Sequence, residues 1–99
     1  MKLTDAARGQ ACTIAVPNFC NGNPDTTIAA HYRSVSLGAG MGKKPPDILC
    51  AHACSSCHDC IDGRIRTPYT RNELRLMHAE GVLRTILRLS AMGLIQVGE

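Results

Sequence analysis

The sequence predicts a single small α+β domain over residues 1–99, with several short strands, a short helix and a long C-terminal helix. Short apolar runs bounded by glycine, proline and asparagine predict the strands. A Cys-x-x-Cys pair at Cys54 and Cys57 predicts the start of a helix that presents metal ligands. Apolar residues at three- and four-residue steps after Pro68 predict the long helix. Because no repeat or linker divides the chain, we expect one domain.

The N-terminal half is predicted to alternate short elements with turns. Thr4 is a candidate cap for a short helix over residues 5–8. Residues 17–27 contain Asn-Gly and Asn-Pro pairs, and residues 34–44 are rich in glycine, which predicts two loops. Three apolar runs predict strands at residues 12–16, 27–33 and 48–53.

The C-terminal half is predicted to be mainly helical. The cysteine helix ends at Gly63, and the long helix runs from near Pro68 to about Met92, before a final strand at residues 94–97. The predicted buried stripe of the long helix is Leu76, Ala79, Leu83, Ile86 and Leu87. Three apolar residues outside the stripe suggest a homodimer contact through this helix: Leu74, Met77 and Leu89.

Four arginines of the long helix form like-charge pairs four residues apart. These pairs, Arg71 with Arg75 and Arg84 with Arg88, are mildly unfavourable unless anions lie nearby. The alternative interpretation is an ordinary solvated helix surface. The formal net charge of +3 permits a polyanionic partner without requiring one.

A chain of 99 residues with three aromatic side chains buries little apolar surface, so we expect a covalent or metal staple. Six cysteines are available for it. The first residues contain no apolar run typical of a secretion signal, which favours reduced thiols, metal binding and the cytoplasm of a bacterial cell over disulfides. No apolar run is long enough to span a membrane.

The expected staple is a structural zinc ion held by four thiolates. Cys54 and Cys57 supply one pair of ligands, and the second pair should come from distant sequence so that the metal ties the N-terminal region to the helix. The predicted ligand set is Cys12, Cys20, Cys54 and Cys57. Cys50 and Cys60 are then small buried side chains, although spacing alone also allows Cys50 in place of Cys12. A redox Cys-x-x-Cys is a further alternative, without the βαβ context that such motifs have.

A second site is predicted next to this zinc, because zinc bound by four cysteines has no open coordination position for chemistry. His58 and Asp62 lie four residues apart and therefore share one face of the short helix, while His31 ends a predicted strand. One imidazole opposite a metal-binding pair suits hydrolysis of a phosphodiester. The alternative for His31 is a hydrogen-bonded structural residue, the role that we also assign to His52 and His78.

Several motifs of the chain resemble a known family. They are Ala-Arg-Gly-x-x-Cys, Cys-Asn-Gly-Asn-Pro, Ala-His-x-Arg, Lys-Pro-Pro-Asp, Ala-Cys-Ser-x-Cys-His-Asp-x-Ile-Asp and His-Ala-Glu-Gly-x-x-Arg-Thr. They are similar to small lambdoid phage and prophage proteins described as "putative nucleases", and their order resembles the HNH, or His-Me finger, nucleases with a zinc-bound treble clef. The resemblance implies a ββα-metal fold, with His31 as general base and His58 as a ligand of a catalytic magnesium or other divalent ion. It also implies four cysteines on structural zinc, and DNA as substrate.

The chain departs from the HNH pattern at three positions. Ala30 precedes His31, where many such enzymes have an acidic residue or a second histidine that binds the metal. Asp62 stands where the second helical ligand is often histidine, and its carboxylate suits magnesium. The nearest counterpart of the middle asparagine of the motif is Asp47.

The sequence therefore predicts a metal-dependent DNA endonuclease in phage DNA processing or recombination, with His31, His58 and Asp62 as its catalytic residues. Contacts to the DNA backbone are expected from basic side chains. The candidates are Arg33, Lys43, Lys44, Arg64 and Arg66. The alternative function is a non-catalytic zinc module that binds DNA or a replication or recombination protein.

Overall fold

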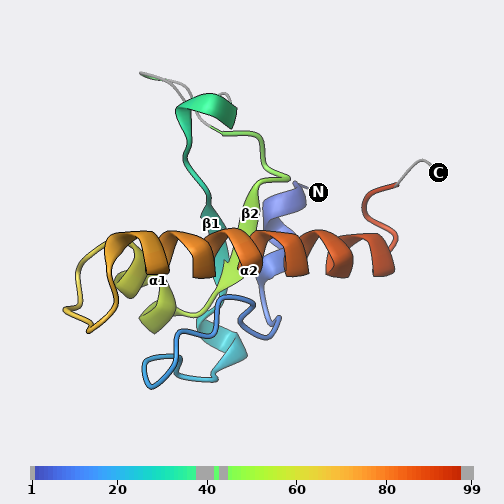
Figure 1. The fold of residues 1–99 in the computed structure, drawn as a ribbon. Coiled ribbons are helices and arrows are strands. Elements are labelled where there is room, and N and C mark those ends of the chain that lie inside the picture. The colour runs from blue at the N-terminus through green and yellow to red at the C-terminus, as the bar shows by residue number, and fades with distance from the viewer. Residues whose placement is uncertain (1, 38–41, 43–44, 97–99) are drawn as a thin grey trace.

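The structure is a computed structural model that describes residues 2–37, 42 and 45–96. It is a small α+β fold in which a two-stranded sheet lies behind a long helix (Figure 1). In chain order the elements are the 3₁₀ helix η1 (Leu3–Ala7), the 3₁₀ helix η2 (Pro24–Thr26), β1 (Ile28–His31), the 3₁₀ helix η3 (Val35–Leu37), β2 (Cys50–Ala53), α1 (Ser55–Ile61) and α2 (Arg71–Ala91).

The strands β1 and β2 form an antiparallel pair that leads directly into α1. Ile28 pairs with Ala53 at one end of the sheet, and His31 pairs with Cys50 at the other. All four residues of β2 are buried, because the strand lies between η1 and α2. The two strands and the helix α1 thus follow one another in the order β-β-α that the sequence predicts, with His31 at the end of β1.

The helix α2 crosses the sheet and packs mainly on β2 (Figure 1). The Thr70 hydroxyl caps its first turn by accepting a hydrogen bond from the Glu73 amide at 3.1 Å, and the Glu73 carboxylate accepts a hydrogen bond from the Thr70 amide. This capping box starts the helix at Arg71, three residues after the predicted start near Pro68. Among the described residues no helix is both long enough and apolar enough to cross a membrane.

The predicted strand at residues 12–16 is wrong, because this segment is irregular. Ala15 and Asn18 have φ angles of 51° and 68°, which an extended strand does not tolerate. The segment is instead anchored by single contacts, such as the bond of 2.7 Å from the Thr13 amide to the His52 carbonyl. The predicted final strand is also not found at residues 94–96, and Val97 lies outside the described residues.

The predicted buried stripe of α2 is wrong at its three leucines, whereas Ala79 and Ile86 are partly buried and Ile86 packs against the core. Leu76, Leu83 and Leu87 are 61, 62 and 73% exposed. The buried face consists of His78, Gly81, Val82, Thr85 and Leu89. Leu89, which the sequence assigned to a dimer contact, is therefore in the interior, and the other two residues of that set, Leu74 and Met77, are partly buried against the core. The physical reason is close packing: a Cβ built on Gly81 would lie 2.9 Å from Ile14 Cγ1 and 3.2 Å from Ala51 Cβ, so leucine does not fit between α2 and β2.

Candidate metal centre and active site

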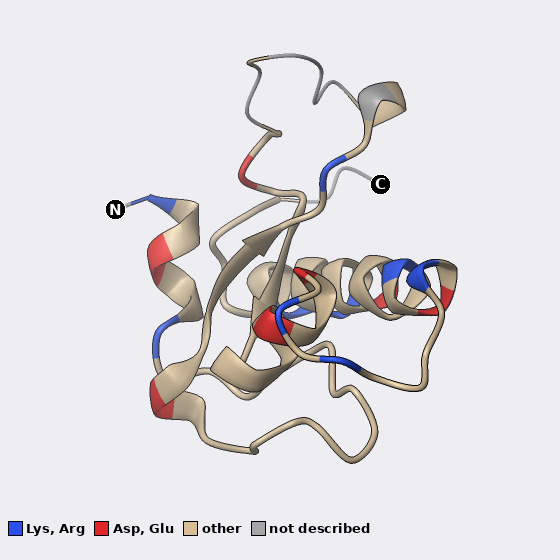
Figure 2. Ribbon diagram, turned by 90° about the vertical axis from the view of Figure 1, so that its left-hand side faces the viewer, with Lys and Arg blue, Asp and Glu red and all other residues tan. Residues whose placement is uncertain are grey.

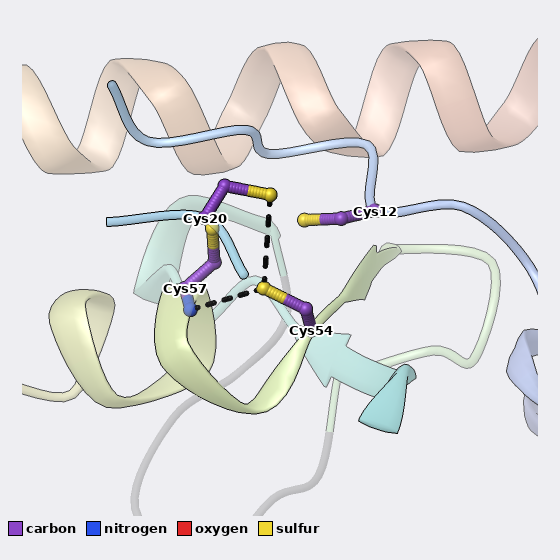
Figure 3. A group of neighbouring side chains, drawn as sticks. All are labelled: Cys12, Cys20, Cys54 and Cys57. Atoms are coloured by element: carbon purple, nitrogen blue, oxygen red, sulfur yellow. Dashed lines mark hydrogen bonds between the residues drawn. The ribbon is translucent and has the colours of Figure 1, made fainter. Parts of the chain in front are cut away.

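Four cysteines from two distant parts of the chain converge at the start of α1. Cys54 is the N-cap residue of α1 and Cys57 lies in its first turn, while Cys12 and Cys20 flank the irregular segment that passes over them. Their four sulfur atoms all lie within 4.8 Å of one another (Figure 3). The cysteines are therefore positioned to hold a metal ion, in the ligand set that the sequence predicts.

The distances fit a tetrahedral thiolate site. With metal–sulfur bonds of about 2.3 Å, the sulfur atoms of such a site lie about 3.8 Å apart. The sulfur atoms of Cys54 and Cys20 are 3.8 Å apart. Backbone amides of Ala15, Val16 and Cys57 each donate to a cysteine sulfur at 3.4 Å, so the site has amide donors that stabilise thiolate charge.

The thiols of the cluster differ in pKa. A hydrogen bond from the Cys57 thiol lowers the pKa of Cys12 to about 4. The same hydrogen bond, followed by burial, raises the pKa of Cys57, and burial raises the pKa of Cys20. Without a cation the cluster therefore keeps some of its thiols protonated, because negative charges this close repel one another.

The other two cysteines take no part in the cluster. Cys50 and Cys60 are 4 and 0% exposed, which confirms the prediction that they are buried. Burial raises the pKa of Cys60. All six cysteines lie among the described residues, and none forms a disulfide.

His31 lies in contact with Asp47, which the sequence singled out as the counterpart of the middle asparagine. Its Nε2 is 3.0 Å from Asp47 Oδ1, and the imidazole is 18% exposed. Because an ionised carboxylate only accepts hydrogen bonds, this contact places a proton on Nε2, and the neutral imidazole then has its lone pair on Nδ1. The strand end and the loop before β2 thus hold one imidazole in a defined tautomer.

His58 and Asp62 lie on the same side of α1, as their spacing predicts. The distance from His58 Nε2 to Asp62 Oδ2 is 3.4 Å. Arg64 lies over the same acidic surface, with Nη1 3.2 Å from Asp59 Oδ1 and Nη2 3.5 Å from Asp62 Oδ2. Within the described part of the chain, the four cysteines are the one group of three or more histidine, cysteine or acidic side chains whose ligand atoms lie together. A second ion at this position would therefore have at most two protein ligands of these types, His58 and Asp62.

One cleft of about 960 Å³ joins these groups. Both His31 and His58 line it, together with Asp62, although they come from β1 and α1. Its walls also carry basic side chains. These are Arg33, Arg64, Arg66, Arg71 and Arg75.

The basic residues approach the cleft from three segments. Figure 2 shows them on the connection between α1 and α2 and on the near end of α2, around the acidic residues of α1. Arg33, Arg64 and Arg66, which the sequence proposed as DNA contacts, all line the cleft. Lys43 and Lys44 lie outside the described residues.

Arg71 and Arg75 were not among the DNA contacts proposed from the sequence, although their like-charge spacing was a signal of a nearby anion. Arg75 stacks over the Tyr32 ring at 4.9 Å and donates to its hydroxyl at 3.1 Å. The second pair has a different role. Arg84 and Arg88 donate to the carbonyls of Thr13 and Ala11 at 2.8 and 2.7 Å, so they fasten the N-terminal segment to α2.

The two remaining histidines are buried and hydrogen-bonded, as expected for structural residues. His78 Nε2 donates to the Ala30 carbonyl at 2.9 Å, and burial lowers its pKa. His52 Nδ1 accepts a hydrogen bond from Arg88 Nη1 at 3.0 Å.

The fold and the site define a small α+β protein with four cysteines positioned to hold a metal ion and with a basic cleft. The chain belongs to the family described as "Putative nuclease YbcO", whose model matches residues 1–94. It is 52% identical over 62 residues to "Putative nuclease YbcO" of Escherichia coli K12 and, with the same identity, to "Putative nuclease ybcO" of Enterobacteria phage 82. Each alignment covers 63% of this chain and 64% of the relative, so the match spans just under two thirds of these curated proteins.

A solved structure has the same fold. It is described as the structure of a putative bacteriophage protein from Escherichia coli K-12 MG1655. The two chains share 38% identity and superpose with a TM-score of 0.76, over 91% of this chain and 98% of the other. The fold of the computed structure is therefore that of an observed protein.

Proposed function

We propose that this protein is a metal-dependent DNA endonuclease of the HNH type, which hydrolyses phosphodiester bonds in phage DNA processing or recombination. The observation that carries the proposal is that His31 and the His58–Asp62 pair line one cleft whose walls contain five arginines. A base, a pair of metal-ligand side chains and phosphate-binding cations are the groups that this hydrolysis needs.

His31 is the proposed general base. Asp47 accepts from Nε2, so the lone pair on Nδ1 is available to take a proton from water. Asp47 itself acts as a positioning residue, because it holds the ring in this tautomer at the end of β1. Its carboxylate also stabilises the imidazolium that forms when the proton is taken.

His58 and Asp62 are the proposed ligands of the catalytic divalent ion, magnesium or another. Their nitrogen and oxygen atoms lie 3.4 Å apart, near the separation of about 3 Å expected for adjacent ligands of one small octahedral ion. Two protein ligands suit magnesium, which usually keeps several waters and binds substrate phosphate. When bound, such an ion neutralises charge that builds on the phosphate and on the departing oxygen.

The arginines of the cleft are the proposed contacts to the DNA backbone. A guanidinium group can donate two parallel hydrogen bonds to the oxygens of one phosphate, and it is always charged. Arg33, Arg66 and Arg71 are exposed and line the cleft wall, so their charge is available to an incoming phosphate. Lys43 and Lys44 remain proposed contacts from the sequence alone.

Zinc is the proposed ion of the four-cysteine cluster, where it has a structural role. Four thiolates are a typical zinc ligand set and leave no open position for a substrate. The order of β1, β2 and α1, with the cluster at the start of α1, supports the assignment to the ββα-metal, treble-clef type. In this arrangement the structural ion fixes α1, and α1 presents His58 and Asp62.

The proposal is tested by nicking of supercoiled plasmid DNA with magnesium, manganese or nickel. We expect His31→Ala and His31→Gln to lower the nicking rate about 10²- to 10⁴-fold, the usual contribution of a general base. His31→Gln is the matched variant, since its amide can still hydrogen-bond to Asp47 without acting as a base. Both variants should keep the zinc content and thermal stability of the wild type.

The outcome also separates the enzyme from a binding module. If the wild type binds DNA but cleaves none with any of the three ions, the protein is a non-catalytic zinc module and the nuclease proposal is wrong. If both His31 variants cleave at the wild-type rate, cleavage exists but His31 is not its base.

A further inference from the structure

We propose that α2 forms an antiparallel homodimer through the leucines on its outer face. Leu76, Leu83 and Leu87 are separated by seven and four residues, so they fall on one side of the helix. This side lies opposite the face that contains Val82, Thr85 and Leu89 and packs onto the sheet. The three leucines are the most exposed of the described large apolar residues, at 61, 62 and 73%.

Such a stripe is unusual on a free surface. Single exposed leucines are ordinary, but three that are aligned on one helix face form a continuous apolar strip that water solvates poorly. In Figure 1 the side of α2 turned away from the sheet faces the viewer, and no other described element covers it. A partner is therefore expected there.

The charges beside the stripe identify the partner as a second copy. Glu80 and Arg84 flank Leu83, and their side chains are 51 and 55% exposed. Within one chain Arg84 donates through Nη1 to the Thr13 carbonyl at 2.8 Å, while its Nη2 lies 3.9 Å from Glu80 Oε2, which is beyond hydrogen-bonding distance. Arg84 Nη2 and the Glu80 carboxylate can therefore also contact a partner.

The spacing of these residues matches a two-fold axis. Residue 82 is the midpoint of Glu80 and Arg84, and the midpoint of Leu76 and Leu87 falls between residues 81 and 82. An axis perpendicular to two antiparallel copies of α2 at this point places Glu80 opposite Arg84 of the other copy. It also brings Leu76 against Leu87 and places the two copies of Leu83 side by side.

A parallel pair lacks this match. It would place Glu80 level with Glu80 and Arg84 level with Arg84 of the other copy, so neither charge would meet an opposite one across the axis. The arrangement that satisfies both the leucines and the charges is thus antiparallel. Arg71 and Arg75 point to the cleft, on a different side of α2, so the dimer leaves that cleft open. This inference does not depend on the proposed nuclease activity.

The test measures self-association by sedimentation velocity across a wide range of protein concentration. We expect the wild type to be in monomer–dimer equilibrium. Leu83→Glu should weaken the dimer about 100-fold or more, since it sets two carboxylates against each other in the apolar strip. Leu37→Glu is the control, because Leu37 is also exposed, at 47%, but lies outside α2.

The charge pairs provide the decisive experiment. Glu80→Arg alone and Arg84→Glu alone should each weaken the dimer at least about tenfold, because each creates like-charge pairs across the axis. An equal mixture of the two variants should form a heterodimer in which both pairs are again opposite in charge. Circular dichroism should show that each variant keeps the wild-type helix content.

Three results would each overturn the proposal. The first is a wild type that stays monomeric at every concentration. The second is a dimer that persists unchanged in Leu83→Glu. The third is a pair of charge variants that dissociate alone and fail to associate when mixed.

Discussion

The four histidines illustrate at the scale of single residues how hydrogen bonds assign roles to one side-chain type. His31 and His58 each face a carboxylate, at 3.0 and 3.4 Å, and line the cleft. His52 and His78 are buried and contact an arginine and a carbonyl. The first pair therefore lies in the cleft where the proposed chemistry would take place, and burial lowers the pKa of each histidine of the second pair, which favours the neutral form.

His52 makes folding sensitive to pH. It is 2% exposed, and burial together with the positive charge of Arg88 lowers its pKa from 6.5 to about 4. The unfolded chain therefore binds a proton as the pH falls below 6.5, while the folded chain does not. We expect the full stability above pH 6.5 and a loss of up to about 3 kcal/mol as the pH falls from 6.5 to 4.

Urea unfolding as a function of pH measures this loss. His52→Asn is the matched variant, because its amide oxygen can accept the Arg88 hydrogen bond but does not titrate. Acid also releases metal from thiolates, and this contribution is common to both proteins. An unchanged pH dependence in His52→Asn would show that the loss comes from other groups.

At the scale of elements, the contact between α2 and β2 is set by small residues. Ala51 on β2 and Gly81 on α2 allow the backbones to approach closely, and Thr85 fills the next turn with a hydroxyl that donates to the Gly81 carbonyl at 2.8 Å. The same Thr85 hydroxyl accepts from the His52 amide at 3.1 Å. Thr85 can therefore be buried in this contact, because its hydroxyl is hydrogen-bonded.

Gly81→Ala reports on this contact. In an exposed helix interior this change stabilises by about 1 kcal/mol. Here the added Cβ would meet Ile14 Cγ1 at 2.9 Å, so we expect a net loss of about 1–3 kcal/mol in the free energy of unfolding. Chemical denaturation measures it, with Asn72→Ala on the exposed side of α2 as the control that should be neutral or slightly stabilising. A stabilised Gly81→Ala protein would mean that α2 and β2 lie further apart.

At the scale of the whole molecule, the four-cysteine cluster is the cross-link between distant parts of the chain. It joins Cys12 and Cys20, which lie in irregular backbone, to the start of α1. The described sheet has only two strands, which rarely suffice for stability by themselves. A metal ion bound by the four cysteines would therefore be expected to contribute a large part of the folding free energy.

Metal removal tests this dependence. We expect elemental analysis to find about one zinc per chain, and a strong chelator to unfold the domain, with loss of the helical signal in circular dichroism. Cys54→Ser should lose the metal and the fold. Cys60→Ser is the matched control in the same helix, and should retain both, because Cys60 lies outside the cluster. A chelated protein that keeps its melting temperature would contradict a structural role for the ion.

The sequence by itself determined the local chemistry of this protein. The spacing of Cys54 with Cys57, and of His58 with Asp62, places each pair on one side of α1, since a helix repeats every three to four residues. The pairing with Cys12 and Cys20 followed from the need of a small domain for a long-range staple. Burial of Cys50 and Cys60 and a structural role for His52 and His78 were also predicted, and all four side chains are buried.

Only the tertiary structure decided which face of α2 is buried and which arginines meet. The leucines gave the stronger hydrophobic pattern, but the close approach of Gly81 to Ala51 and Ile14 leaves no room for a large side chain at that point of the contact, so Gly81 lies inside and Leu83 outside. Arg33 and Arg71 are far apart in sequence and come together at one cleft through packing between β1, α1 and α2. Periodicity describes a single element, whereas these features depend on the shape of the surface that the element meets.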